Sequence, residues 1–545
     1  MKETEQENGT SSQENALGTA PIGKLLFSLA VPAITAQVVN MLYNIVDRIY
    51  IGHIPEIGTA ALTGVGITFP IITLISAFSS LIAMGGAPRA SIAMGAHHKE
   101  RAERIMGNCF TALLALSVVL TAVFLVFQEP ILWAFGASGN TIGYAMDYMG
   151  IYVCGTVFVQ ISLGMNMFIT SQGFAKTSML TVIIGAVLNI ALDPVFIFAF
   201  NMGVQGAAIA TVLSQAVSAV WVLLFLCGKR TTLKIRPKCM VIKWRVLLPV
   251  LGLGVSPFIM QSTESLLSVV LNTSLLRYGG DTAVGAYTVI ASIMQVINLP
   301  LQGLTQGAQP ITSFNYGARN MERVRKSVRL LLTCTLTYSC LFWLAIMLIP
   351  QVFVGIFTSD PELMDTAVWA ARIFLFGVFS FGAQTGFQQS FLALGQAKAS
   401  LLLALLRKIV LLIPLIYIFP LFFGDKLFGV FVAEPVADIL AASTTTITFL
   451  VWAEGTCGTK KRWTPKSGPR QNCRGPFSSA LTLGRLFAQS IAAIAHQVLL
   501  CVQLGGALHQ LLLKHRRQRV EIEPGFKVHL AGFWHREFLL YRGWQ

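Results

Sequence analysis

Residues 24–54 read KLLFSLAVPAITAQVVNMLYNIVDRIYIGHI. This stretch is apolar for longer than the about 20 residues that a helix needs to cross a bilayer. It nevertheless contains Asp47, and a charged side chain near the bilayer centre costs roughly 2.5–3.5 kcal/mol. Asn40, Asn44 and Asp47 are spaced so that they share one helical face. We expect this polar face to meet a partner helix or a wet cavity, the alternative being that Asp47 pairs at the membrane interface near the helix end.

The composition of the whole chain is that of a polytopic membrane protein. Of its 545 residues, 54% are hydrophobic and 12% are charged, whereas soluble domains carry about 25% charged residues. The nine cysteines are scattered without a CxxC pair, which argues against a disulfide framework and against a zinc site. Residues 1–20 are polar and lack the apolar core of a signal peptide, so we interpret them as a disordered cytoplasmic arm.

Long apolar segments recur along the chain and predict an all-α protein with twelve transmembrane helices. They are too long and continuous for the strands of a membrane barrel, and helices satisfy their own backbone hydrogen bonds in lipid. The predicted spans are 24–51, 60–83, 105–127, 143–170, 178–199, 205–227, 246–276, 283–304, 327–355, 366–393, 399–423 and 427–453.

The net charge of +16 is concentrated in alternate connections and in the last part of the chain. Lysine and arginine gather in the predicted loops 85–104, 228–245 and 305–326. Basic loops face the cytoplasm, which predicts that both ends of the twelve-helix body are cytoplasmic. Such a basic surface fits anionic membrane lipid, whereas no motif supports nucleic acid as a partner.

An internal repeat divides the body into two halves. At a single offset of 222 residues, motifs at two distant places coincide. Gly85, Pro88, Ser91 and Gly95 fall on Gly307, Pro310, Ser313 and Gly317, and Gly173, Ala175, Lys176 and Ser178 fall on Gly395, Ala397, Lys398 and Ser400. Because each half holds six helices, both insert the same way up, as in a parallel repeat with its substrate site near the midplane. The predicted division is an N-lobe at 21–227, a basic cytoplasmic linker at 228–245, a C-lobe at 246–453 and a basic, atypical tail at 454–545.

Polar residues of the N-lobe predict one buried cluster. Asn189 and Asp193 are four residues apart and share a helical face, and Pro194 should kink the helix immediately after them. Together with Asp47 and with Thr211 of the sixth span, they form the candidate set. For Asn189 and Thr211 the alternative is a helix–helix hydrogen bond, which averages about 0.6 kcal/mol in membranes.

The C-lobe has its own charged candidates, Glu264, Arg407, Glu434 and Asp438. For Glu434 and Asp438 we favour a structural ion pair with Arg407. Glu264 either binds a coupling ion or braces helices, and the sequence favours bracing slightly.

Several separated motifs resemble the multidrug and toxic compound extrusion (MATE) family, in particular its MepA-like bacterial branch. The resemblance covers about residues 21–453 and agrees with the twelve-span repeat. The motifs are VPAITAQVVNMLYNIVDRIYIGHI, GGAPRASIAMGAHHKERAERIMGN, SQGFAKTSMLTVIIGAVLNIALDPVFIF and GAQPITSFNYGARNMERVRK. The resemblance implies a V-shaped pair of six-helix lobes that exports organic cations in exchange for protons or sodium.

The resemblance also implies roles for individual residues. The family's N-lobe acid falls on Asp47, its Asn-x-x-x-Asp pair on Asn189 and Asp193, and its threonine on Thr211. Its tyrosine and asparagine of the fourth helix fall on Tyr148 and Asn166, and the helix-seven acid of some members falls on Glu264. The tail from residue 454 departs from the family pattern. It could be a thirteenth span or surface helix, a regulatory tail, or translation past a lost stop or a shifted frame.

These observations favour a secondary active multidrug antiporter in a bacterial inner (cytoplasmic) membrane, with the N-terminus in the cytoplasm. Two buried carboxyls that titrate as a coupled pair can let proton and cationic drug compete for one cavity. Sodium remains the other coupling ion, since Asp47, Asn189, Asp193 and Thr211 offer the oxygen ligands it prefers.

The rival functions have weaker support in the sequence. A flippase for a lipid-linked precursor should line its cavity with cationic residues for phosphate, whereas the N-lobe set is acidic and neutral. No span carries HExxH, a Ser-His-Asp set or a phosphate loop, so the chain should not be an enzyme. We expect no cofactor, small organic cations and membrane lipid as partners, and a monomer.

Overall fold

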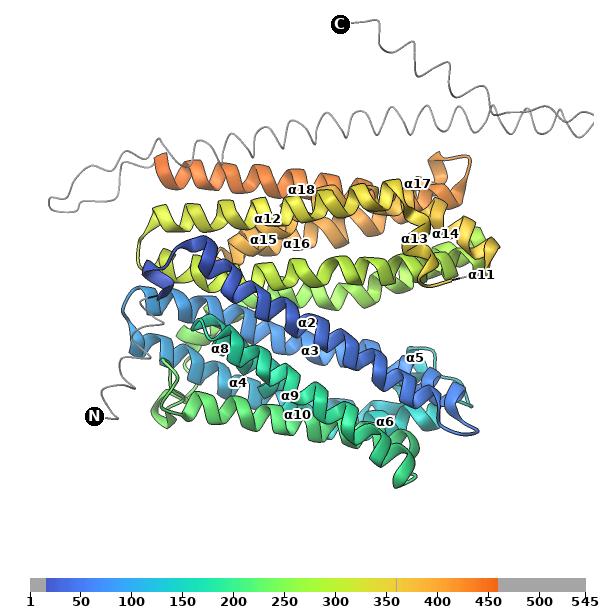
Figure 1. The fold of residues 1–545 in the computed structure, drawn as a ribbon, viewed down its shortest axis with the longest axis horizontal. Coiled ribbons are helices and arrows are strands. Elements are labelled where there is room, and N and C mark those ends of the chain that lie inside the picture. Colours follow the sequence, from blue (N-terminus) through green and yellow to red (C-terminus); the bar gives the residue numbers. More distant parts are fainter. Residues whose placement is uncertain (1–15, 359, 459–545) are drawn as a thin grey trace, which may run out of the picture. The chain divides into compact units, whose positions relative to one another are not determined.

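The computed structural model describes residues 16–358 and 360–458 (Figure 1). All regular elements of this part of the chain are helices, which confirms the predicted all-α class. The first fifteen residues of the predicted arm and the predicted tail from residue 459 on lie outside the described residues.

The first half runs from residue 22 to residue 227. Its helices are α2 (Ile22–Gly52), α3 (Gly58–Gly95), α4 (Lys99–Val126), α5 (Gln128–Ala134), α6 (Ile142–Cys154), α7 (Thr156–Val159), η1 (Gln160–Met165), α8 (Asn166–Ser171), α9 (Ala175–Pro194), η2 (Val195–Ala199) and α10 (Gly203–Cys227). Of these, η1 and η2 are π-helical turns within longer rods.

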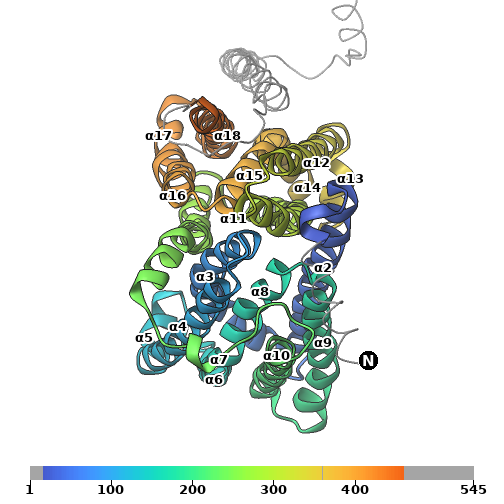
Figure 2. The same ribbon diagram turned by 90° about the vertical axis from the view of Figure 1, so that its left-hand side faces the viewer.

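The second half follows the short helix η3 (Pro237–Cys239) of the linker. Its helices are α11 (Trp244–Gly317), α12 (Met321–Leu348), α13 (Pro350–Gly355), α14 (Pro361–Phe374), η4 (Leu375–Gly377), α15 (Val378–Ala393), α16 (Ala397–Leu405), the π-helical η5 (Leu406–Leu412), α17 (Ile413–Phe422) and α18 (Lys426–Gly458). Figure 2 shows α12–α18 gathered apart from α3–α10.

The number of membrane spans agrees with the sequence pattern. Ten helices in the described residues are long and apolar enough to cross a bilayer, and the pair Ile142–Cys154 and Thr156–Ser171, bent by 58°, makes one further span. At 1.5 Å per residue the 74 residues of α11 would measure roughly 110 Å, far more than one bilayer. The rod is broken at Gly280, whose φ of 65° is not helical. With α11 counted as two helices, the described body has twelve spans.

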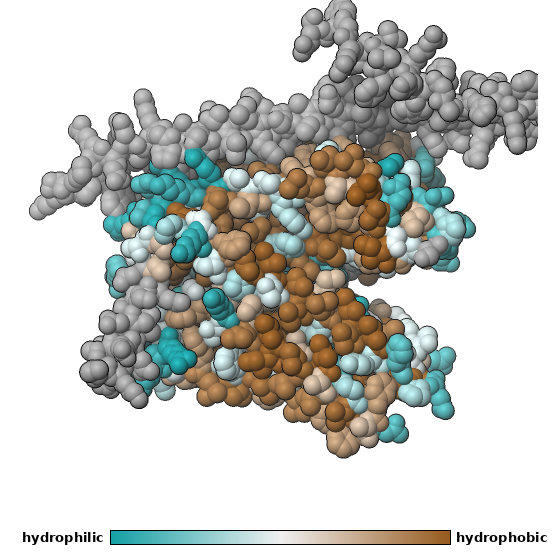
Figure 3. All heavy atoms as spheres, in the orientation of Figure 1, coloured by the Kyte–Doolittle hydropathy of each residue, from teal (hydrophilic) through white to brown (hydrophobic). Residues whose placement is uncertain are grey.

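The outer surface of the body is that of a protein solvated by lipid. Large apolar side chains are widely exposed; Leu421, for example, is 77% and Phe422 is 79% exposed. Figure 3 shows apolar side chains across the middle of the body and hydrophilic ones at both ends. Such a broad apolar band is costly in water and is what a bilayer requires.

The contacts confirm the internal repeat in three dimensions. The hydroxyl of Ser91 donates to the carbonyl of Ser171 at 2.7 Å, and Ser313 donates to the carbonyl of Ala393 at 2.7 Å. Both residues of the second bond lie 222 positions beyond those of the first. The offset therefore relates whole helix pairs and not only sequence motifs.

The predicted loops 85–104 and 305–326 are wrong at their beginnings, because α3 stays helical to Gly95 and α11 to Gly317. A Cβ on Gly95 would meet the backbone of Phe314, and a Cβ on Gly317 would meet the backbone of Ile92. Glycines thus let α3 and α11 cross closely, as small residues do at membrane helix interfaces. This packing holds the glycine-rich ends in helical form.

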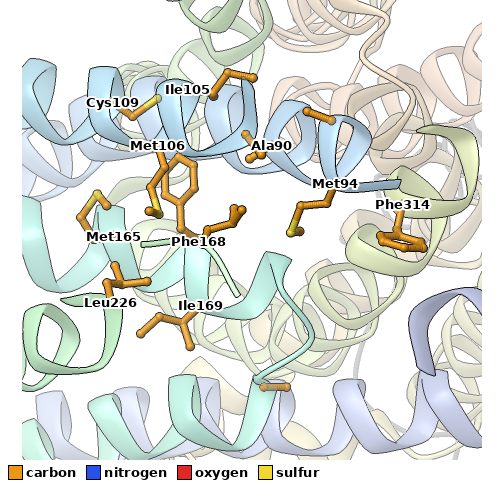
Figure 4. Close-up of a cluster of buried hydrophobic side chains, with 14 of the residues drawn as sticks. Ala90, Met94, Ile105, Met106, Cys109, Met165, Phe168, Ile169, Leu226 and Phe314 are labelled. Carbon is orange, nitrogen blue, oxygen red and sulfur yellow. The ribbon is translucent and has the colours of Figure 1, made fainter. Parts of the chain in front are cut away.

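One of the buried apolar clusters joins the two halves. It centres on Phe168 and Met106 of the first half and includes Phe314 of the second (Figure 4). The three other clusters of described residues each belong to one half. The halves are therefore packed together where α2 and α3 meet α11 and have separate cores elsewhere.

Two chain segments that precede the halves each dock on the other half. The carbonyl of Leu17 accepts from Asn315 at 3.0 Å and from Arg323 at 3.3 Å, so the segment before the first half binds the second. The carbonyl of Cys239 accepts from Asn108 at 3.0 Å, so the segment before the second half binds the first. Leu17 and Cys239 are again 222 positions apart.

Candidate functional site

Two carboxylic acids meet inside the first half. Asp47 of α2 and Asp193 at the end of α9 are both buried, Asp193 with 0% exposure. Their carboxyl groups lie within hydrogen-bonding reach of each other. Because a carboxylate only accepts hydrogen bonds, a bond between two carboxyls needs a proton between them. This pair can therefore hold or release a proton.

Asn189 and Thr211 complete the predicted cluster. The side-chain amide of Asn189 donates to Asp193 Oδ1 at 3.2 Å and to the hydroxyl of Thr211 at 3.3 Å. Asn189 and Asp193 are one helical turn apart on α9, and Thr211 faces them from α10. The structure thus brings together the four residues that the sequence grouped.

The cluster has acceptor capacity that its neighbours do not use. Asp47 Oδ1, Asp193 Oδ2 and Asn189 Oδ1 are buried without a hydrogen-bond partner among the described residues. The cation next in sequence, Arg48, instead stacks over the ring of Phe69, with Cζ 4.9 Å from its centroid. Buried unsatisfied oxygens are costly, so the site suits a proton or a cation that would satisfy them.

Tyrosines surround the acids. Tyr148 of α6, which the resemblance suggested, is 4% exposed and lies within hydrogen-bonding reach of Thr211. Its ring stacks on Tyr152 with centroids 6.1 Å apart. Tyr43 lies beside Asp47, one turn earlier on α2. Our sequence interpretation missed Tyr43 and Tyr152, although their four-residue spacing from Asp47 and Tyr148 was a usable signal.

A cavity extends from this cluster between α2, η1, α9 and α10. Its empty volume is about 450 Å³, part of it open to solvent. The lining consists of amide, hydroxyl and apolar groups: Asn40, Tyr43, Ser162, Leu163, Asn166, Thr181, Val182, Gly185, Ala186, Asn189, Thr211, Ser214, Gln215 and Ser218. Because part of this space is open to solvent and it adjoins Asn189, it provides a route by which a small molecule can approach the acids.

Two other predicted residues take different positions. Asn166 lines the cavity, where its amide donates to the carbonyl of Ser178 at 3.2 Å and its Oδ1 has no partner among the described residues. Asn44 is half-buried and donates to the carbonyl of Asn40 on its own helix at 2.6 Å. Asn44 therefore stays outside the cluster despite sharing a helical face with Asp47.

Irregular helical turns border both the acids and the cavity. The expected break at Pro194 is present, since α9 ends there and continues as the π-helical turn η2. Proline lacks the N–H that an α-helical turn would use, and π-helical turns frequently occur at functional sites. The turn η1 carries Ser162 and Leu163 into the cavity wall.

The second half contains a buried ion-pair cluster. The guanidinium of Arg407 contacts Asp438 Oδ1 through Nε at 2.8 Å and through Nη2 at 2.6 Å. Nη2 also lies 3.7 Å from Glu434 Oε1, and Cζ lies 4.7 Å from the ring centroid of Phe381. Arg407 is thus placed against both carboxylates, as the sequence suggested.

Lys408 was not among the predicted residues. Its ammonium group lies 2.8 Å from Glu264 Oε1; the lysine side chain is 5% exposed and the glutamate side chain 59%. In an α-helix the neighbours Arg407 and Lys408 would point about 100° apart, which is why the sequence gave no sign that both are buried. The wider turn of η5 brings both inward.

Comparisons with known proteins found similar sequences. The family model described as MatE matches residues 32–195 and 257–418. Among curated proteins, the multidrug export protein MepA of Staphylococcus haemolyticus (strain JCSC1435) is 23% identical over 422 residues, which cover 77% of this chain and 92% of that protein. MepA of Staphylococcus aureus (strain MSSA476) is 23% identical over 423 residues, covering 78% and 92%.

Solved structures are similar as well. A structure of the MATE multidrug transporter DinF-BH is 37% identical with a TM-score of 0.74, covering 80% of this chain and 97% of that chain. A MATE structure in the bent conformation is 24% identical with a TM-score of 0.77, covering 83% and 98%.

Proposed function

Because this chain belongs to the MATE family of multidrug efflux transporters, we propose that it is an antiporter that exports organic cations in exchange for protons. Members of the family are transporters and not enzymes, and this chain is accordingly a multi-pass membrane transporter. The proposal concerns the coupling ion, the class of cargo and the residues that bind them.

The observation that supports proton coupling is the contact between Asp47 and Asp193. Two carboxyls that share a proton titrate as one coupled unit. When the pair is ionised, its negative charge attracts a cationic drug; when it gains protons, that attraction is lost. Proton and drug then exclude each other, and a cycle that exposes the pair to each side in turn exchanges one for the other.

The cavity supports organic cations as the cargo. It adjoins the acids at Asn189 and Thr211, and its lining includes the aromatic ring of Tyr43. Aromatic faces attract cations, with about 2 kcal/mol or more where water is excluded. A flat aromatic cation therefore finds both a ring and a carboxylate at this end of the cavity.

Sodium is the second candidate for the coupling ion. The unpartnered oxygens of Asp47, Asn189 and Asp193 are hard donors of the kind that alkali and alkaline-earth ions prefer. We favour the proton because two carboxyls this close can hydrogen-bond to each other only when one of them is protonated.

A flippase for a lipid-linked precursor has less support. Such a function needs cations that are free to bind phosphate. Arg407 and Lys408, the two cations of the C-lobe cluster, each face carboxylates.

The test is dye efflux from proteoliposomes that contain the full chain. Ethidium export is measured under an imposed pH gradient and, separately, under an imposed sodium gradient, for the wild type, Asp47→Asn and Asp193→Asn. We expect export driven by the pH gradient in the wild type and a strongly lower rate in both variants. Export by both variants at the wild-type rate under either gradient would refute this coupling site.

Three further elements of the proposal follow from the family and from the charge pattern. We propose that the chain resides in the cytoplasmic membrane of a bacterium, that residues 16–20 and the basic connections lie in the cytoplasm, and that the transporter acts as a monomer. Blue-native electrophoresis of the purified chain tests the last element, for which a stable dimer is the contrary result.

A further inference from the structure

The ion-pair cluster of the C-lobe contains more acids than bases. Its members are the carboxyls of Glu264, Glu434 and Asp438 and the cations Arg407 and Lys408. Arg407, Glu434 and Glu264 each interact electrostatically with other members of the set. Taking ions out of water is costly unless their charges are matched, so a surplus carboxylate in this position requires an explanation.

The surplus falls on Glu434. Asp438 accepts two short contacts from Arg407, and Glu264 takes the ammonium of Lys408 at 2.8 Å. Glu434 has only the 3.7 Å contact with Arg407, and its Oε2 is buried without a hydrogen-bond partner among the described residues. Glu434 is 5% exposed, so water does not compensate for the missing partner.

The internal repeat places Glu434 where the N-lobe has its own site. Beyond the π-helical turn η5 the offset grows by one residue: a Cβ on Gly206 would meet the backbone of Phe196, and one on Gly429 would meet Phe419. Both pairs are related by 223 positions, as the extra residue of a π-helical turn requires. At this offset Glu434 corresponds to Thr211.

We infer that Glu434 is a second proton-binding site of the transporter, which holds a proton that neutralises the surplus charge of the C-lobe cluster. A metal ion fits less well, because the guanidinium of Arg407 lies 3.7 Å away and would repel it. A proton needs one oxygen atom, and Glu434 Oε2 is free to carry it. The protonated carboxyl of Glu434 can then donate a hydrogen bond, whereas the ionised carboxylate could only accept one.

One member of the cluster, Glu264, is exposed. Gln261 of α11 donates to Ser80 of α3 at 2.9 Å, and Glu264 follows one turn later, 59% exposed. Tyr287 of the same rod lies within the electrostatic reach of both Glu434 and Glu264. A tyrosine hydroxyl both donates and accepts, so Tyr287 has the chemistry to pass a proton between Glu434 and the more exposed Glu264.

Infrared spectroscopy of the full chain at neutral pH tests this proposal without relying on transport. The protein is grown with glutamate labelled with carbon-13 at the side-chain carboxyl, which shifts glutamate bands and leaves those of Asp47 and Asp193 in place. We expect a labelled band of a protonated carboxylic acid in the wild type and its loss in Glu434→Gln. A wild-type spectrum without that band would show that Glu434 is ionised and would overturn the proposal.

Variants of the partners test the charge count itself. Glu264→Gln leaves two acids facing two bases, so Glu434 should ionise and the band should disappear although Glu434 is unchanged. Lys408→Met leaves three acids facing one base, so the band should grow. The exposed Glu129→Gln is the matched control and should leave the band unchanged. An identical band in Glu264→Gln, Lys408→Met and the wild type would contradict the inference.

Exchange of the proton is measured on the same labelled protein. After transfer into deuterium oxide, the band should shift within the time of one efflux assay. A band that keeps its hydrogen frequency through that time would show a permanently held proton and would refute the exchange through Tyr287.

Discussion

Equivalent helical segments have opposite roles in the two lobes: α9 lines a cavity in the N-lobe, and η5 carries buried cations in the C-lobe. In the N-lobe, Gly185 and Ala186 of α9 line an open cavity beside two acids. At the offset of 222 residues these positions become Arg407 and Lys408, whose side chains are buried against the acids of the C-lobe. The small side chains of the N-lobe leave room for a ligand, whereas the long cationic side chains of the C-lobe pair with its buried carboxylates. One scaffold therefore provides a binding site in one lobe and an ion-paired core in the other.

The largest expected effect is on the stability of the C-lobe. Arg407→Met removes the base that faces Asp438 and Glu434, and loss of one partner of a buried ion pair costs about 3–5 kcal/mol. Unfolding in detergent by denaturant should show this loss. The double variant Arg407→Met/Asp438→Asn should regain most of it, since no unpaired Asp438 charge remains. If Arg407→Met were as stable as the wild type, the C-lobe would not depend on its buried ion pairs, and this difference between the lobes would be refuted.

The next effect concerns transport by the N-lobe. A charge-assisted contact contributes about 1.5–3 kcal/mol, so Asp193→Asn should lower the pH-driven export of a cationic dye about 10- to 100-fold. Its unfolding free energy should barely change, because no buried cation loses a partner. Asn44→Ala is the matched control on α2 and should export normally. Equal losses in Asp193→Asn and Asn44→Ala would show that the lower export does not depend on the carboxyl of Asp193.

Glu264→Gln should have a smaller effect. The Glu264 side chain is 59% exposed, so solvent screens its pair with the buried Lys408, and Glu434 remains close enough to interact with the lysine. We expect a slightly lower unfolding free energy and an export rate within about twofold of the wild type. Complete loss of export by a stably folded Glu264→Gln would instead assign the coupling ion to the C-lobe.

The last prediction tests the parallel repeat that relates the two lobes. The cysteine variants used for it should transport like the wild type. Lys99→Cys and Met321→Cys occupy equivalent positions, 222 residues apart, at the starts of α4 and α12. In a background without other exposed cysteines, a membrane-impermeant thiol reagent should label both from the cytoplasmic side. Glu129→Cys, beyond the other end of α4, should be labelled from outside. Labelling of Lys99→Cys and Met321→Cys from opposite sides would exclude a parallel repeat.

Periodicity and spacing predicted much of this architecture. The spans follow from apolar length, the repeat from a shared offset, and the cluster of Asp47, Asn189, Asp193 and Thr211 from polar residues on lipid-embedded helices. These features depend on the regular geometry of the α-helix, which a sequence displays directly.

The features that the sequence did not predict depend on departures from that geometry. The burial of Lys408 beside Arg407 requires the π-helical turn η5, for which we saw no pattern. The helical ends at Gly95 and Gly317 look like loops because glycine disfavours isolated helices. They are held by packing against the other half of the chain, which no local window contains.

The crossing of α3 and α11 has a consequence for the origin of the chain. Gly95 meets Phe314, and Gly317 meets Ile92, so that residue i of one half contacts residue j of the other and the reverse. Reciprocal contacts of this kind define the interface of a two-fold symmetric homodimer. In a homodimer of six-helix chains, a single glycine codon would supply the glycine at both crossings, the equivalents of Gly95 and Gly317. After a duplication and fusion, each crossing and each lobe could change by itself, so that one lobe could keep a cavity while the other carries Arg407 and Lys408.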